Sequence, residues 1–164
     1  MDTISRERRS WNMSRIKSEN TSPEKRVRAA LHRLGFRFRL HERSLPGKPD
    51  IVLPGLKVSI LVHGCFWHRH SGCPFAYMPK TRLTFWRTKF EGNVERDRRV
   101  RRDLRKEGQR VVVIWECQTK NPTLLEGRIA RSLVVTRAKK PAVNGAHEAA
   151  DSAVALCESN IVSR

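Results

Sequence analysis

The chain has 164 residues, and its 34 lysines and arginines against 16 aspartates and glutamates give a formal net charge of +18. That length suits one domain, and no apolar run approaches the roughly 20 residues of a membrane-spanning helix. Residues 1–13 lack the apolar stretch of a signal peptide, so we expect an intracellular, cytoplasmic protein with no membrane partner. So large a positive excess on a small body favours a polyanion as the partner.

The first part of the chain predicts a basic arm followed by a helix. Residues 1–20 are polar and basic and are interpreted as the arm. The helix is expected to begin at Thr21, because Thr21 and Glu24 have the spacing of a capping box. Apolar residues then recur with helical spacing as far as Gly35, which is a suitable residue to end the helix.

Four segments have the residue patterns of β-strands: residues 36–40, 50–53, 57–62 and 110–115. The last is the richest in β-branched residues and is predicted to be a buried strand. The second and third are joined by a tight turn, which favours antiparallel pairing and hence a mixed sheet. Helical patterns cover residues 82–108, where Gly92 is a point of division into two pieces, and residues 122–135.

Helices that alternate with short strands predict an α/β fold, in which helices flank a small central mixed sheet. The folded domain is expected to span residues 21–136. Residues 137–164 are rich in alanine and weakly patterned, so they are interpreted as a flexible C-terminal tail. The long loop at residues 63–79 is predicted to be functional or held by a metal ion, because loops of that length seldom lack such a role.

Three potential metal ligands, Cys65, His70 and Cys73, lie close together in this loop. Cys117 follows the predicted strand at residues 110–115 and is the expected fourth ligand, which gives a set of three cysteines and one histidine that is typical of structural zinc. His63 and His68 compete with His70 for the histidine position. The alternative is a group of reactive or redox-active thiols. Cys157 lies in the tail and is interpreted as a spare thiol.

Two carboxylates and one histidine suggest hydrolytic chemistry. Asp50 begins a predicted strand, where aspartate is disfavoured, although it also suits a simple turn. Helical spacing places Asp97 on the same face as Val94 and Leu104, so its charge needs a partner, either an arginine or a histidine. If His70 binds zinc, His68 is free to take a proton from water while Asp50 holds Mg²⁺, the arrangement needed for phosphodiester hydrolysis.

Aromatic and basic residues surround these groups. Phe66 and Trp67 lie inside the loop, and for them insertion between DNA bases and ordinary packing are equally good interpretations. The arginines of residues 95–106 favour contact with phosphates. The competing hypothesis is a zinc-stabilised DNA-binding module without catalysis, and a weaker one is an RNA-binding, ribosome-associated factor.

Five motifs together identify a family. SLPGKPD, HGCFWHRHSGC, TRLTFW, NVERDRR and VVVIWEC occur in this order, and over residues 8–136 the chain closely resembles the very short patch repair endonucleases. The resemblance implies a fold like that of type II restriction endonucleases. It also implies an enzyme that nicks double-stranded DNA beside the T of a T·G mismatch left by deamination of 5-methylcytosine. A monomer is expected, and mismatch-repair proteins are candidate partners.

The resemblance also assigns roles to matching positions. Mg²⁺ is expected on Asp50 and on the main-chain carbonyl of Val62, which stands where family members often have threonine. His68 is expected to be the catalytic histidine, Asp97 its partner carboxylate, and Glu24 a glutamate near the active site. The segment HRHSGC departs somewhat from the family in its histidine count and length. The expected zinc ligands are Cys65, His70, Cys73 and Cys117, and the expected intercalating residues are Phe66, Trp67, Trp86 and, on the arm, Met13.

Overall fold

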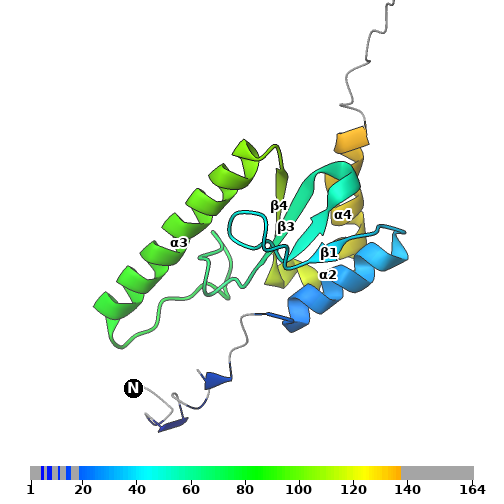
Figure 1. Cartoon of the computed structure of the whole chain (residues 1–164). Coiled ribbons are helices and arrows are strands. Elements are labelled where there is room, and N and C mark those ends of the chain that lie inside the picture. Colours follow the sequence, from blue (N-terminus) through cyan, green and yellow to red (C-terminus); the bar gives the residue numbers. More distant parts are fainter. Residues whose placement is uncertain (1–4, 6, 9–10, 12–13, 16–18, 138–164) are drawn as a thin grey trace, which may run out of the picture.

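In the computed structural model, a four-stranded sheet with the order β1-β2-β3-β4 forms the centre of the domain (Figure 1). The structure describes residues 5, 7–8, 11, 14–15 and 19–137, so Met13 and the predicted tail from residue 138 onward lie outside the described residues. Among the described residues, no helix is long and apolar enough to cross a membrane. The elements in chain order are α2 (Ser22–Arg33), β1 (Arg39–Leu40), β2 (Ile51–Leu53), β3 (Val58–His63), α3 (Leu83–Lys106), β4 (Arg110–Trp115) and α4 (Pro122–Arg137).

The sheet is mixed, which confirms the prediction. β1, β2 and β3 pair antiparallel, because short connections join them, whereas β3 and β4 pair parallel from Val58↔Arg110 to His63↔Trp115. The connection between the parallel strands contains the long loop and α3, as a crossover requires. The carboxyl ends of β3 and β4 therefore lie side by side.

Two predicted elements differ from the structure. β1 is shorter than residues 36–40, because Phe36 donates its N–H to the carbonyl of Leu31 at the end of α2 and so cannot yet pair with β2. α3 runs unbroken through Gly92. That glycine is exposed, and residues that favour helices on both sides outweigh its modest intrinsic cost.

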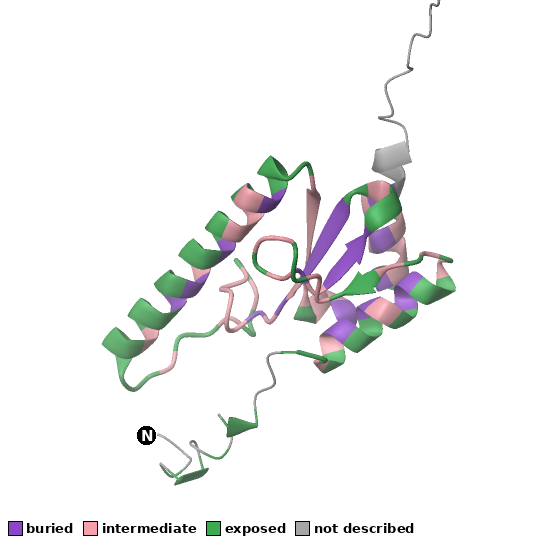
Figure 2. Ribbon diagram, viewed as in Figure 1, coloured by how far each residue is buried: buried purple, intermediate pink, exposed green. Residues whose placement is uncertain are grey.

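The beginning of α2 follows its sequence signal. Thr21 and Glu24 form the predicted capping box, and Gly35 follows the helix with φ of +75°. α2 and α4 pack on one another and on one face of the sheet, whereas α3 runs along the other side (Figures 1 and 2). The core between these two helices and the strands consists of Val27, Ala30, Leu31, Ile51, Leu53, Val58, Ile60, Ile114, Leu125, Ile129 and Leu133.

The predicted strand at residues 110–115 is present as β4, but the prediction that it is buried is wrong. Only Ile114 of β4 is buried, and its other residues are half-buried. The reason is strand order, because β4 is an edge of the sheet and only β3 pairs with it. The buried strand is β3, whose alternating side chains direct Ile60 toward α2 and α4 and Leu61 and His63 toward α3.

The loop between β1 and β2 approaches α3 closely at Gly47. Replacing Gly47 by alanine should lower the free energy of unfolding by roughly 1 to 3 kcal/mol, because the residue is left-handed and an added Cβ would crowd its neighbour. Its φ is +71°, and that Cβ would lie 2.4 Å from Cγ1 of Val100. Urea unfolding provides the measurement.

The matched control is Gly55→Ala, whose added Cβ would meet nothing within 4 Å. Combining Gly47→Ala with Val100→Ala should relieve most of the crowding, because it removes the contacts at 2.4 and 2.6 Å and leaves only that with Cβ of residue 100 at 3.1 Å. Equal stability of the Gly47→Ala and Gly55→Ala variants would show that the loop moves away from α3 without strain.

Candidate active site and metal centre

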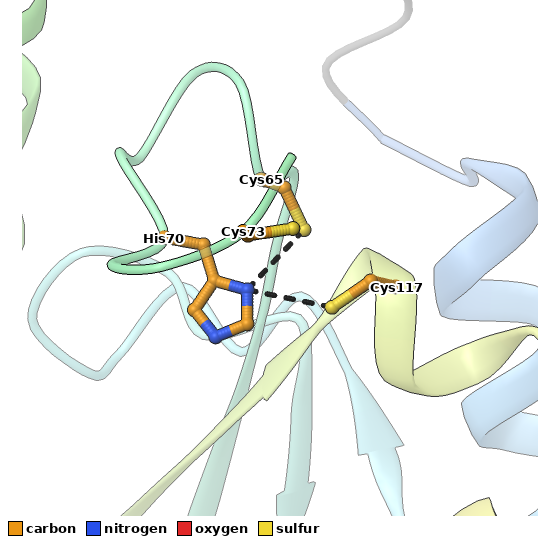
Figure 3. A group of neighbouring side chains, drawn as sticks. All are labelled: Cys65, His70, Cys73 and Cys117. Carbon is orange, nitrogen blue, oxygen red and sulfur yellow. Dashed lines mark hydrogen bonds between the residues drawn. The ribbon is translucent and has the colours of Figure 1, made fainter. Parts of the chain in front are cut away.

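Four thiol and imidazole groups meet where β3 and β4 end (Figure 3). Cys65 and Cys73 come from the loop that joins β3 to α3, here called the Cys/His loop (residues 64–82), and Cys117 follows β4. Their sulfur atoms and one ring nitrogen of His70 all lie within 4.8 Å of one another. The parallel pairing of β3 and β4 explains the meeting, because it brings residues 65 and 117 to the same edge.

The geometry of this group fits a tetrahedral zinc ion. Nδ1 of His70 lies 3.6 Å from Sγ of Cys65 and 3.4 Å from Sγ of Cys117. Zinc bond lengths of roughly 2.3 Å to sulfur and 2.1 Å to nitrogen give about 3.6 Å between two such ligands at a tetrahedral angle. Burial raises the pKa of the Cys65 thiol to about 12, so a thiolate at this position needs a cation beside it.

The imidazole of His70 is fixed by packing. It stacks on the ring of Trp115, with 4.3 Å between the ring centroids and 10° between the planes. His68, in contrast, points into a cleft of about 810 Å³ beside the cysteine cluster. The two histidines of the HRH segment thus take different positions, although sequence spacing alone left both available for the metal.

Asp50, Val62, His68, Asp97 and Glu24 all line that cleft. The structure therefore brings together the residues that the sequence pointed to from α2, from the start of β2, from β3, from the Cys/His loop and from α3. Trp67 also lines the cleft and joins it to the aromatic residues of the loop.

His68 and Asp97 form the closest polar contact in the cleft. Nδ1 of His68 lies 2.6 Å from Oδ2 of Asp97. Burial works against the charged form of Asp97, but the hydrogen bond and charge of His68 outweigh it and hold the pKa of this carboxyl below its ordinary value. An ionised Asp97 keeps the proton of His68 on Nδ1, which leaves Nε2 able to accept a proton.

His63 completes this group from the end of β3. Its ring stacks on that of His68 with 4.0 Å between centroids, and its Nδ1 lies 3.9 Å from Oδ2 of Asp97. Burial, with the nearby charge of His68, lowers the pKa of His63 to about 4. His63 is therefore neutral at pH 7 and supports His68 by packing without adding a competing charge.

Asp50 is held against the neighbouring strand. Its Oδ2 accepts a hydrogen bond of 2.7 Å from the N–H of Val62. Burial raises the pKa of Asp50 to about 6, and the charge of Glu24 adds to this effect, although the bond from Val62 opposes it. A half-buried carboxylate whose charge its surroundings stabilise only weakly is a good ligand for a divalent cation.

Glu24 is more constrained. One carboxylate oxygen accepts from the N–H and the hydroxyl of Thr21, and the other accepts from the N–H of Asn20 and, at 2.9 Å, from Arg28. His41 lies 3.9 Å from the same oxygen. Glu24, His41 and Asp50 nevertheless place one ligand atom each within 4.8 Å of one another, so Glu24 adds negative charge next to Asp50.

Three of the expected intercalating residues, Phe66, Trp67 and Trp86, form a single aromatic cluster, whereas Met13 lies outside the described residues. Phe66 packs edge-on against Trp67, Trp86 and the buried Phe90, with centroid distances of 5.1 to 5.4 Å. Phe66, Trp67 and Trp86 are each half-buried, so they combine packing within the protein with an accessible face. Tyr77 lies 5.2 Å from Phe66 and is 63% exposed.

Sequence reasoning missed two residues of the site. His63 was considered only as a zinc ligand, although its position in β3, two residues after Leu61, places it on the α3 side of the sheet. The second is Asn93 of α3, which is buried, whereas Val94 was the residue expected to face the core. The side-chain amide of Asn93 donates to the carbonyl of Trp67 at 3.0 Å. The separation of four residues between Asn93 and Asp97 on a helix was the available signal.

Replacing Asp50 by asparagine should stabilise the protein at pH 7 in buffer without added magnesium. The folded protein binds the Asp50 proton more tightly than the unfolded chain does, because the pKa is raised from 3.8 to about 6. The wild-type protein therefore loses this stability as the pH rises through 6. The variant should gain roughly 2 to 3 kcal/mol at pH 7 and nothing below about pH 4, measured by urea unfolding. A pH-independent difference between the two proteins would contradict this explanation.

Comparison with known proteins gives the family. Residues 1–73 match the model of the family described as DNA mismatch endonuclease Vsr. The type II nicking enzyme V.XorIIP of Xanthomonas oryzae is 48% identical over 132 residues, which are 80% of this chain and 96% of that protein. The type II nicking enzyme V.NmeAIP of Neisseria meningitidis is 41% identical over 130 residues, which are 79% of this chain and 92% of that protein.

The DNA mismatch endonuclease Vsr of Escherichia coli is 45% identical over 109 residues, which are 66% of this chain and 69% of that enzyme. Identity at this level over most of each chain, together with a cleft that unites acidic and imidazole groups, leads to one conclusion. This chain belongs to the Vsr family of DNA mismatch endonucleases.

Proposed function

We propose that the protein nicks double-stranded DNA beside the T of a T·G mismatch, the product of 5-methylcytosine deamination, and so begins very short patch repair. The observation that carries this proposal is the single cleft lined by Asp50, His68 and Asp97. The same proposal places the enzyme on chromosomal DNA in the cytoplasm, as a monomer that leaves its nick to other repair proteins. It also assigns the domain to the type II restriction endonuclease fold.

Magnesium is the proposed catalytic cofactor. Asp50 and the main-chain carbonyl of Val62 would hold it, since Mg²⁺ prefers oxygen ligands and keeps several waters. The two adjacent carboxylates of Asp50 and Glu24 favour a cation between them and the substrate. When bound, the ion would polarise the scissile phosphate and stabilise the charge that develops on its oxygens.

His68 is the proposed general base. Its Nδ1 is occupied by Asp97 at 2.6 Å, so Nε2 is the atom that takes a proton from the attacking water. Asp97 fixes the orientation of the ring and stabilises the imidazolium that forms. The stacked, neutral His63 holds the ring from its other side.

The aromatic cluster supports selectivity for a mismatch. Phe66, Trp67 and Trp86 are proposed to enter the base stack from the loop, together with Met13 from the arm. A T·G wobble pair is easier to unstack than a matched pair, so the same wedge costs less free energy at the mismatch. The adjacency of Trp67 to His68 supports this proposal, because base opening and catalysis would then take place at neighbouring residues.

Replacing Asp50 or His68 by alanine should abolish magnesium-dependent nicking of a T·G duplex. Loss of the general base should lower the single-turnover rate by about 10²- to 10⁴-fold, whereas binding of the duplex should stay within a fewfold of wild type. The matched control is His32→Ala, because His32 is exposed on α2 and lies outside the cleft.

The measurement is a denaturing gel with T·G and T·A duplexes, with and without Mg²⁺. Wild-type protein that binds a T·G duplex but never cuts it would favour the non-catalytic DNA-binding hypothesis. Nicking that persists in both variants would contradict the assigned site, and equal treatment of the two duplexes would contradict mismatch specificity.

Zinc is the proposed metal of the cysteine cluster. The purified protein should contain about one zinc ion per chain, and Cys65→Ser or Cys117→Ser should lose the ion and unfold at a lower temperature, because metal binding is coupled to folding. Elemental analysis and thermal unfolding test this. Cys157→Ser is the control, since Cys157 lies outside the predicted ligand set, and retention of full zinc by Cys117→Ser would contradict the proposal.

A further inference from the structure

Lys48 lines the cleft that contains Asp50, although no role has been given to it above. It precedes Asp50 by two residues in the loop between β1 and β2. Its backbone is left-handed, with φ of +49°, and it follows Gly47, which is also left-handed. A lysine in this conformation is uncommon, and such backbone outliers gather at functional sites.

The ammonium group of Lys48 is paired with Glu19, at the end of the arm. The Glu19 side chain is 44% exposed and that of Lys48 is 35% exposed. An ion pair so open to water and salt is weak, and another anion can replace one partner at little cost. Glu19 also lines the cleft, so the pair lies in the cleft to which the proposed function assigns the substrate phosphate.

The charges of the cleft favour such an exchange when an anionic phosphate binds. Among the described residues that line it, the carboxylates Glu19, Glu24, Asp50, Asp97 and Glu116 outnumber the cations Lys48, Lys89 and Arg96. The chain as a whole carries +18, so the cleft departs from the rest of the molecule. Moving Glu19 away removes one negative charge and frees one positive charge close to Asp50.

We propose that Lys48 binds a phosphate of the DNA strand at the active site, and that Glu19 occupies this position in the free protein and is displaced by the substrate. The inference rests on the proposed function, because it assumes a phosphodiester substrate. It assigns Lys48 to substrate binding and Glu19 to competition with the substrate.

Two substitutions should shift DNA affinity in opposite directions. Lys48→Met should weaken binding of a T·G duplex about tenfold and reduce the slope of log K against log salt by about one unit. Glu19→Gln should tighten binding about two- to threefold. In the double variant, Glu19→Gln should have no effect beyond that of Lys48→Met, and Lys48→Arg should retain most of the affinity. Fluorescence anisotropy without magnesium, over a series of KCl concentrations, separates binding from cleavage.

Matched controls exist for both changes. Lys57 is also left-handed, with φ of +51°, but it lies at the opposite end of β3 from the cleft, so Lys57→Met should leave the affinity within twofold. Glu107→Gln removes a charge from the far end of α3. Both are exposed and outside the cleft lining.

If Lys48→Met and Glu19→Gln both weakened DNA binding, the pair would have only a structural role. That result would overturn this inference and leave the proposed function standing. An unchanged salt slope in Lys48→Met would do the same. Wild-type protein that binds neither T·G nor T·A duplex would overturn the proposed function and this inference with it.

Discussion

The hydrogen bond between Asp97 and His68 connects the Cys/His loop to α3 next to the aromatic cluster. His68 comes from the loop whose Phe66 packs on α3, and Asp97 comes from that helix, on the other side of the sheet from α2 and α4. A carboxylate buried to this extent is costly unless it is paired. Its 2.6 Å bond to His68 therefore fixes the loop against α3 and at the same time gives the buried carboxylate of Asp97 a hydrogen-bond partner.

The neighbouring contact strengthens this connection. Asn93, one turn before Asp97, donates to the carbonyl of Trp67. α3 thus holds two consecutive loop residues, one by its backbone and one by its side chain. On the other side of the loop, residues 65, 70 and 73 gather beside Cys117, where a bound metal ion would fix them. With a metal ion bound there, the loop would be held from two directions, which is what a site built on irregular structure requires to keep its geometry.

Local patterns account for most of what the sequence predicted. The capping box of α2, the pair of strands around a tight turn and the cysteine spacing are each defined within about ten residues, and each has the expected form in the structure. The half-burial of β4 was not predictable in this way, because it depends on the order of strands. The packing of His63 against His68 and the hydrogen bonds that occupy Glu24 likewise depend on neighbours from distant segments. For Phe66 and Trp67, the sequence supported core packing and insertion between DNA bases equally. Their half-buried state in the structure is compatible with both.

β3 directs its side chains to two different environments. Ile60 belongs to the apolar core, whereas His63, three residues later, lies close to Asp97. Inserting or deleting one residue within this strand would exchange the two faces, so that an imidazole entered the core and an aliphatic side chain faced the cleft. A change of one residue in the length of β3 would therefore damage the core and the cleft together.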